Sequence, residues 1–400
     1  MMAAYKYDVC VVGGLGHVGL PLSMMLADKG LRVCAFDISK EAYETTSKGR
    51  LHFMEENGEP ILKRVLANGM LTLSLSKDSI LESEAVIITI GTPIDLHLSP
   101  EVAVEDFISK NLDYIKDGQL LVLRSTVYPG TTEKVHNLLV SSGKKVDLAF
   151  CPERIAQGYA VRELVELPQI VSSTTEHGIE RASKLFGVLT DDIITLPPKE
   201  AELAKLFTNA WRYIKFAAAN QFYIIANETN ADFYRIYKAM SYKYPRVADL
   251  PSAGFASGPC LFKDTVQLNA FANSNFHIGN SAIQINEGLP AYMVSKLKQK
   301  YDLRTKSVGI LGLAFKAEND DKRDSLSYKL MKSLKFDVKN LYYTDPYAKE
   351  PGSIDAEELV RKSDIIILAT PHKRYAKLNI GKDKVLVDIW GFYSKAQKGT

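Results

Sequence analysis

The pattern of residues 7–37 constrains the fold of this chain more than any other part of the sequence. A nearly continuous apolar run, YDVCVV at 7–12, leads directly into GGLGHVG and then into apolar residues at helical spacing. Such a run is typical of a parallel strand that is covered on both faces. The next apolar run, LRVCAF at 31–36, ends at Asp37. Strand, glycine turn, helix and strand in this order predict the first unit of a doubly wound α/β sheet.

The glycines of this unit form the pattern G-x-G-x-x-G and predict a dinucleotide site. The first glycine permits a tight turn, the second lets a pyrophosphate approach the backbone, and the third lets the helix pack closely on the strand. The following carboxylate can accept hydrogen bonds from a ribose 2′-hydroxyl and would repel a 2′-phosphate, so we expect NAD rather than NADP. The expected cofactor-binding residues here are Gly14, Gly16, His17, Val18, Gly19 and Asp37.

Two further apolar runs predict more strands, each followed by a polar turn. AVIITI at 85–90 leads into Gly-Thr-Pro, and QLLVLR at 119–124 leads into Ser-Thr. Open α/β sheets bind their ligands at the carboxyl ends of the strands, where these turns lie. We therefore add Thr92, Ser125 and Thr126 to the expected cofactor site.

Three more runs extend the same domain. KVDLAFCPERIAQG at 145–158 predicts a strand and a turn that carries Glu153 and Arg154. PQIVSS at 168–173 and DIITL at 192–196 are strand-length and are expected to complete the sheet.

From Pro198 the character of the sequence changes. More than forty residues follow without glycine or proline, and their apolar positions recur at helical spacing, which predicts one long helix or two in series. Such a segment could connect domains or form a dimer interface. Lys205 and Asn209 are four residues apart and share a face; from spacing alone, that face is either solvated or part of a site.

The segment SGPCLFKDT at 257–265 sets a cysteine after a Gly-Pro turn. We expect a helix to begin at Cys260 or just after it, which would lower the pKa of the thiol, and Lys263 would add positive charge. Asp264 could anchor the loop or act as a base toward a water molecule. The alternative is a small buried hydrophobe, because free cysteine is among the most buried residue types.

Several classes of function are disfavoured by the chain as a whole. Its four cysteines form no CxxC pair and no Cys/His metal spacing, so we expect free thiols and no metal. The beginning of the chain lacks the features of a signal peptide, which predicts a cytoplasmic protein. A net charge of +3 without a long basic run argues against nucleic acid, and apolar runs of strand length argue against a membrane span.

The last third echoes the first. KSVGILG at 306–312 predicts a strand and a glycine turn, and LYYTDPYA at 341–348, SDIIILATPH at 363–372 and KVLVDIWG at 384–391 predict further strands. Since no second G-x-G-x-x-G is present, we expect this domain to bind something other than the dinucleotide. The charged turn at 314–325 is either a solvated loop or one wall of a phosphate-bearing site.

Taken together, these segments resemble the nucleotide-sugar 6-dehydrogenases of the UDP-glucose/GDP-mannose dehydrogenase family. The resemblance covers nearly the whole chain and keeps the family's order and spacing. The segments that carry it are GLGHVGLP at 14–21, GTP at 91–93, STVYPGTT at 125–132, PERIAQG at 152–158, AELAKLFTNAWRYIKFAAAN at 201–220, SGPCLFKD at 257–264 and GLAFKAENDDKRDS at 312–325.

This resemblance implies a four-electron, NAD-dependent oxidation of a sugar C6 alcohol to a carboxylate. Cys260 would add to the aldehyde as a thiolate, and the resulting thiohemiacetal would be oxidised to a thioester. The implied roles of the others are oxyanion stabilisation by Lys205 and Asn209, water binding by Asp264 and Thr126, and base catalysis of thioester hydrolysis by Glu153.

The same resemblance implies a set of binding residues. Lys263 and Arg323 would join the cofactor site. The implied substrate-binding residues are Glu153, Arg154, Lys205, Asn209, Arg246, Phe315 and Lys316.

Two motifs bear on which sugar is oxidised. CPER at 151–154 and YPRV at 244–247 are similar to the N-acetylhexosamine branch of the family. Against them, Lys263 is a feature of the glucose branch, and Ser257 replaces one of the family's paired glycines. We favour UDP-N-acetylmannosamine or UDP-N-acetylglucosamine as substrate, with UDP-glucose as the alternative.

At 400 residues the chain is too long for one ordinary core. We expect two Rossmann-like doubly wound α/β domains joined by a long helical region. The expected parts are an NAD-binding domain at 1–198, a central region at 199–300 with the cysteine loop and a homodimer interface, and a UDP-sugar-binding domain at 301–400. The rival functions are a two-electron β-hydroxyacid dehydrogenase and a non-catalytic protein that binds NAD and a UDP-sugar.

Overall fold

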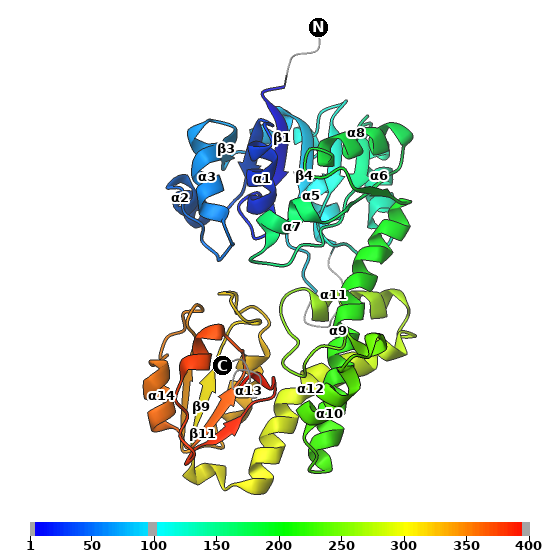
Figure 1. Ribbon diagram of the computed structural model, residues 1–400. Coiled ribbons are helices and arrows are strands. Elements are labelled where there is room, and N and C mark those ends of the chain that lie inside the picture. Colours follow the sequence, from blue (N-terminus) through cyan, green and yellow to red (C-terminus); the bar gives the residue numbers. More distant parts are fainter. Residues whose placement is uncertain (1–4, 95–101, 394–400) are drawn as a thin grey trace. The chain divides into compact units, whose positions relative to one another are not determined.

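The computed structural model describes residues 5–94 and 102–393 (Figure 1). The chain divides into two compact units, Met1–Phe207 and Thr208–Thr400. The division falls inside the long helix α9 (Pro198–Glu228). Among the described residues, each unit contains one sheet.

The first unit is built on an eight-stranded sheet in the order β3-β2-β1-β4-β5-β6-β7-β8. Neighbouring strands are parallel except β6 and β7, which are antiparallel. The strands are β1 (Tyr7–Val12), β2 (Val33–Phe36), β3 (Leu71–Ser74), β4 (Ser83–Ile88), β5 (Leu120–Leu123), β6 (Asp147–Phe150), β7 (Gln169–Ser173) and β8 (Ile193–Thr195). The strand order reverses between β1 and β4, which is where doubly wound sheets bind ligands.

Both faces of this sheet are covered, as the continuous apolar runs predict. Val9 and Val11 of β1 belong to one buried apolar cluster, whereas Cys10 and Val12 belong to another. Because successive side chains of a strand point to opposite faces, the two clusters are the two cores of the unit. The covering helices are α1 (Gly19–Asp28), α2 (Lys40–Ser47), α3 (Gly58–Ala67), α4 (Asp78–Leu81), α5 (Ala103–Lys110), α6 (Thr131–Ser141), α7 (Ala160–Glu166) and α8 (Glu176–Phe186).

The long helical segment is two helices in series. After α9 the chain turns and continues as α10 (Phe233–Ser241). Asn230 in the turn has a φ of 56°, in the left-handed region that ends helices. The Asp232 side chain then accepts hydrogen bonds from the Tyr234 and Arg235 amides and caps α10.

The second unit holds a parallel four-stranded sheet in the order β10-β9-β11-β12. Its strands are β9 (Ser307–Leu311), β10 (Asn340–Thr344), β11 (Ile365–Leu368) and β12 (Val385–Val387), and its further helices are α11 (Leu261–Phe271), α12 (His277–Lys300), α13 (Leu326–Leu334) and α14 (Ala356–Lys362). The predicted fold class, α/β with two largely parallel sheets and a helical region between them in sequence, is confirmed; the antiparallel pairing of β6 and β7 departs from the predicted parallel sheet. Within the described ranges, no helix is long and apolar enough to cross a membrane.

Candidate active site

The turn between β1 and α1 fits a dinucleotide because its glycines leave no room for side chains. A Cβ on Gly14 would lie 2.5 Å from the Val11 carbonyl oxygen, and one on Gly19 would lie 2.1 Å from the Gly13 carbonyl oxygen. Val18 occupies the N-cap position of α1 without capping it through its side chain. The Leu20 amide donates to the Gly16 carbonyl oxygen at 2.9 Å and Pro21 has no N–H, so a ligand would meet the glycine turn and the positive end of the α1 dipole.

The side chains beside this turn are held in place by the fold. Asp37, directly after β2, accepts hydrogen bonds from the Leu15 amide through Oδ2 at 3.1 Å and from the Ser39 amide through Oδ1 at 3.0 Å. The His17 ring stacks on Phe53 with its centroid 4.4 Å away. The carboxylate expected to select NAD is thus fixed beside the glycine turn.

The polar turns after β4 and β5 are tied to each other. The Thr92 hydroxyl donates to the Thr126 carbonyl oxygen at 2.6 Å, and the Ser125 hydroxyl donates to the Ile90 carbonyl oxygen at 2.7 Å. Thr126 itself is half-buried. These contacts bring the three predicted residues to one edge of the sheet.

Glu153 is buried, with 8% of its surface exposed, and both of its carboxylate oxygens have partners. Its Oε1 accepts hydrogen bonds from the Arg154 amide at 2.6 Å and the Ile155 amide at 2.8 Å, and its Oε2 pairs with the guanidinium of Arg124. The Arg154 side chain donates to the Pro168 carbonyl oxygen.

Arg124 is a residue that sequence reasoning missed. It is 1% exposed, donates to Gln169 Oε1 at 3.0 Å and to the Cys151 carbonyl oxygen at 3.1 Å, and lies 4.7 Å from the centre of the Phe186 ring. A charged residue at the end of the buried run LLVLR was the available signal. Buried charges require a partner, and here that partner is the predicted base.

Helix α9 carries two predicted residues one turn apart. Lys205 and Asn209 are both buried, 9% and 4% exposed, which excludes the alternative of a solvated helix face. Earlier in α9, Glu202 accepts hydrogen bonds from the Gly130 amide at 2.6 Å and the Thr132 amide at 2.8 Å, so it caps the start of α6. Glu202 therefore fixes the start of α9 against the turn that follows β5.

In the second unit, the predicted helix begins at Leu261, with Cys260 at its N-cap position. Cys260 is exposed, whereas Cys10, Cys34 and Cys151 are buried. The reading of Cys260 as a buried hydrophobe is therefore wrong. Burial raises the pKa of the Cys151 thiol to about 12, which makes it inert at neutral pH.

Three predicted side chains meet at Asp264, which lies four residues after Cys260 and has no exposed surface. The Asn209 amide donates to Asp264 Oδ2 at 2.6 Å, and the Lys263 ammonium lies 3.0 Å from Oδ1. The Asp264 backbone amide donates to the Cys260 carbonyl oxygen at 2.9 Å. The contacts of Asp264 thus link the nucleophile candidate to α9.

The loop 312–325 lies against the cysteine loop. A Cβ on Gly258 would lie 2.5 Å from the Phe315 ring, and the Gly258 amide donates to the Asp324 carbonyl oxygen at 3.3 Å. Gly258 has a φ of 101°, which favours glycine. Ser257, which stands in place of the family's other glycine, does not have a left-handed φ. A serine therefore fits this position of the turn without backbone strain.

Arg323 is oriented by its neighbour Asp321, with Nη2 2.6 Å from Oδ2. The pKa of Arg323 is raised, first by this hydrogen bonding, while burial opposes the rise and the charges of Asp321 and Cys260 add to it. The Lys316 ammonium lies 5.9 Å from the centre of the Phe315 ring.

Arg246 stands apart from this group. It is exposed on the short 3₁₀ helix η2 (Pro245–Val247), with its guanidinium 5.6 Å from the centre of the Tyr244 ring. Its predicted role in substrate binding draws no support from contacts within the second unit.

Comparison with known proteins decides the family. Models of the UDP-glucose/GDP-mannose dehydrogenase family match residues 7–190 as the NAD binding domain, 199–288 as the central domain and 309–395 as the UDP binding domain. UDP-N-acetyl-D-mannosamine dehydrogenase of Pyrococcus horikoshii is 30% identical over 395 residues, covering 94% of this chain and 93% of the relative. The chain belongs to the UDP-glucose/GDP-mannose dehydrogenase family.

Other members of the family are similar over their whole length. NDP-N-acetyl-D-galactosaminuronic acid dehydrogenase of Ralstonia nicotianae is 26% identical, covering 96% of each chain. The solved structure of the Pyrococcus horikoshii enzyme has a TM-score of 0.87, covering 94% of this chain and 93% of that one. The structure of a UDP-glucose dehydrogenase from Pyrobaculum islandicum also has a TM-score of 0.87, at 25% identity, covering 98% and 99%.

These matches confirm the predicted family, the two-sheet fold, the dehydrogenase class and the NAD cofactor. The turn at 13–19 and the fixed Asp37 carboxylate agree with the NAD-binding assignment of residues 7–190. The UDP binding domain lies in the last third, where the sequence predicts a domain that binds something other than the dinucleotide.

Proposed function

We propose that this dehydrogenase oxidises the C6 alcohol of a UDP-N-acetylhexosamine, the mannosamine or the glucosamine sugar, to the carboxylate. The observation that carries the proposal is the exposed thiol of Cys260 at the start of α11, next to the buried Asp264 that Asn209 and Lys263 hold. An alcohol dehydrogenase that stops at the aldehyde has no use for such a thiol, whereas oxidation to the acid does.

The thiol permits the second oxidation through covalent chemistry. The sulfur of Cys260 adds to the aldehyde carbon, and the aldehyde oxygen takes up a proton, which gives a thiohemiacetal. Loss of a hydride and of that proton gives a thioester; water then adds, the C–S bond breaks, and thiolate and carboxylate are released. NAD+, when bound, supplies the hydride acceptor.

We assign the surrounding residues by the same chemistry. Lys205 and Asn209 stabilise negative charge on the substrate oxygen. Asp264 and Thr126 hold the hydrolytic water, and Glu153 takes its proton. The binding roles proposed for the other residues are cofactor contacts by Gly14, Gly16, His17, Val18, Gly19, Asp37, Thr92, Ser125, Lys263 and Arg323, and substrate contacts by Arg154, Arg246, Phe315 and Lys316.

Two further statements belong to the proposal. The enzyme acts in the cytoplasm, because a free catalytic thiol needs a reducing compartment. It forms a homodimer through α9, on which Phe207, Trp211, Phe222 and Ile225 are 43–55% exposed. We propose three functional parts, 1–198, 199–300 and 301–400; the three separate segments that the family models match, 7–190, 199–288 and 309–395, support this division.

Purified protein assayed with NAD+ and a panel of UDP-sugars tests this function. We expect NADH from UDP-N-acetylmannosamine or UDP-N-acetylglucosamine, in a ratio of two per substrate, and much less from UDP-glucose. A ratio of one would favour the β-hydroxyacid type of reaction. Binding of NAD and UDP-sugar without any NADH would favour a non-catalytic protein.

A further inference from the structure

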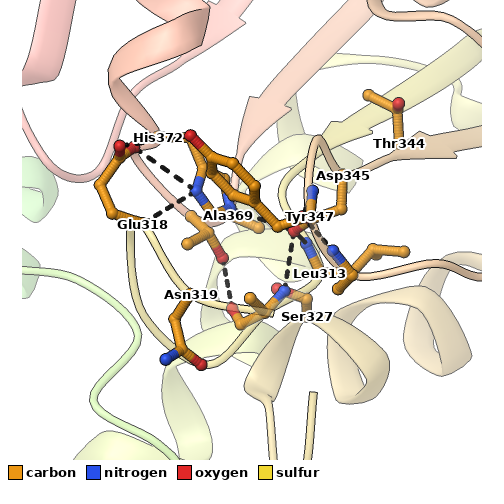
Figure 2. Close-up of polar contacts among 12 residues, drawn as sticks. Leu313, Glu318, Asn319, Ser327, Thr344, Asp345, Tyr347, Ala369 and His372 are labelled. Atoms are coloured by element: carbon orange, nitrogen blue, oxygen red, sulfur yellow. Dashed lines mark hydrogen bonds and ion pairs between the residues drawn. The ribbon is translucent and has the colours of Figure 1, made fainter. Parts of the chain in front are cut away.

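Loop 312–325 supplies Phe315, Lys316 and Arg323 to the proposed site, and its backbone is held by a buried polar network. Figure 2 shows this network, centred on His372 after β11 and Asp345 after β10. Neither residue belongs to the proposed set of binding or catalytic groups. Both residues form hydrogen bonds with the backbone of loop 312–325 and so fix its position.

His372 has no exposed surface and contacts the loop through one nitrogen of its ring. Its Nδ1 accepts a hydrogen bond from the Glu318 backbone amide at 3.0 Å. Because Nδ1 is an acceptor, the proton of the neutral ring is on Nε2, which lies 3.1 Å from Asp345 Oδ2 and donates to it. The ring centroid is 5.2 Å from that of Tyr347 and 5.6 Å from that of Tyr375.

Asp345 anchors the start of the loop. Its Oδ2 also accepts hydrogen bonds from the Leu313 amide at 2.6 Å and the Ala314 amide at 2.9 Å. Burial alone would raise the pKa of Asp345, but the hydrogen bonds from His372 and from backbone amides hold it below its ordinary value. The carboxylate therefore stays ionised at neutral pH and keeps these acceptors.

Glu318, like Asp324, is a non-glycine residue of the loop with a left-handed backbone. Its φ is 54°, a left-handed value that costs a non-glycine residue about 1 kcal/mol. Besides the His372 contact, its Oε1 accepts from the Lys373 amide at 2.8 Å, and its Oε2 accepts from the Tyr347 hydroxyl at 3.3 Å. These bonds hold a backbone conformation that the residue would not adopt alone.

We propose that His372 is a positioning residue, which fixes loop 312–325 through Glu318 and Asp345 and thereby orients the side chains that bind the sugar nucleotide and cofactor. This role rests on the proposed function of the loop. His372 is fully buried and acts only through the residues it holds.

Two substitutions separate the two halves of the ring. In His372→Asn the side-chain oxygen lies near the place of Nδ1 and can still accept from the Glu318 amide. In His372→Gln the amide nitrogen lies near the place of Nε2 and can still donate to Asp345, but the Glu318 amide loses its acceptor. Both variants lose the ring, so each controls for lost packing in the other.

We expect His372→Gln to raise the KM for the UDP-sugar about tenfold with kcat little changed. A less ordered loop weakens substrate binding more than it slows the chemical step. In His372→Asn, which keeps the acceptor for the Glu318 amide, the KM should stay close to that of the wild type. Hydrogen exchange at the Glu318 amide should accelerate in the Gln variant and not in the Asn variant. Equal KM values and equal exchange in the two variants would overturn the proposal.

A third variant serves if His372→Gln does not fold, as judged by circular dichroism. Tyr347→Phe removes only the hydroxyl that donates to Glu318 Oε2, and we expect a KM increase of about threefold together with faster Glu318 exchange. Unchanged exchange in this variant would count against the network. If no UDP-sugar yields NADH, the proposed function fails, whereas Glu318 exchange and calorimetric binding of UDP alone still test the role of His372.

Discussion

Asn209 and Asp264 are joined by a 2.6 Å hydrogen bond in which the side-chain amide donates to a carboxylate with no exposed surface. The other oxygen of Asp264 lies 3.0 Å from the ammonium of Lys263. One carboxylate oxygen thus accepts a hydrogen bond from α9, and the other lies within ion-pair distance of an ammonium on α11. This arrangement fixes the first turn of α11, and with it the place of Cys260.

Replacing Asp264 with Asn should therefore affect both stability and catalysis. Removing one member of a buried charge pair leaves Lys263 without its counter-charge, and we expect the free energy of unfolding to fall by about 3 kcal/mol. We also expect kcat to fall by about a hundredfold or more, since the variant cannot hold the hydrolytic water as a carboxylate does. Urea unfolding and NADH production measure the two effects.

A matched control lies in the same unit. Lys215 and Asp249 form an ion pair of 3.5 Å with Asp249 68% exposed, so Asp249→Asn should change stability by no more than about 0.5 kcal/mol. Equal losses in Asp264→Asn and Asp249→Asn would contradict the structural role of Asp264.

The exposure of the four thiols predicts selective chemistry. Iodoacetamide should modify Cys260 in the native protein and leave Cys10, Cys34 and Cys151 unmodified, because only Cys260 is exposed. Mass spectrometry after digestion gives the extent of modification at each position, and denatured protein, in which all four react, is the control. Modification should abolish NADH formation in step with the loss of the Cys260 thiol; activity that persists after complete modification would exclude the thioester route.

The glycine turn predicts a separate loss of cofactor binding. In Gly19→Ala the added Cβ would lie 2.1 Å from the Gly13 carbonyl oxygen, which is too close, so the turn must open. We expect NAD affinity to fall at least about tenfold, with UDP binding unchanged, because the pyrophosphate lies against the glycine turn and the positive end of the helix dipole. Calorimetry with each ligand measures this.

Gly288→Ala is the control for this substitution, because a Cβ there meets nothing within 4 Å. In the middle of α12 the change should leave NAD binding intact and add about 0.5–1 kcal/mol of stability through helix propensity. A Gly19→Ala variant that binds NAD as tightly as Gly288→Ala does would refute the assignment of the turn.

The local parts of the fold were predictable because their signals are local. The unit at 7–37 and the helix after Cys260 follow from residues next to each other in sequence. One long helix could not be told from two, since the break depends on the left-handed φ of Asn230 and the cap by Asp232. The edge strand β3 was missed because only its first residue is fully buried.

The missed site residues depend on contacts between distant segments. Arg124 holds Glu153 and Gln169, which are 29 and 45 residues away, and His372 contacts Glu318 across 54 residues. A sequence shows a charged residue or a histidine at the end of a strand but not which partner it meets. The antiparallel pairing of β6 and β7 was hidden for the same reason.

The apolar face of α9 yields a last prediction, on assembly. Phe207, Trp211, Phe222 and Ile225 follow one another at intervals of four, eleven and three residues, so they share one face of the helix. Apolar side chains exposed in a row mark an interface, and on a single helix the proposed partner is a second copy. Phe222→Lys should therefore shift the molar mass measured by light scattering from dimer toward monomer. Phe336→Lys, at a site that is 88% exposed outside this face, should leave it unchanged; a wild-type monomer, or equal masses for the two variants, would contradict a dimer through α9.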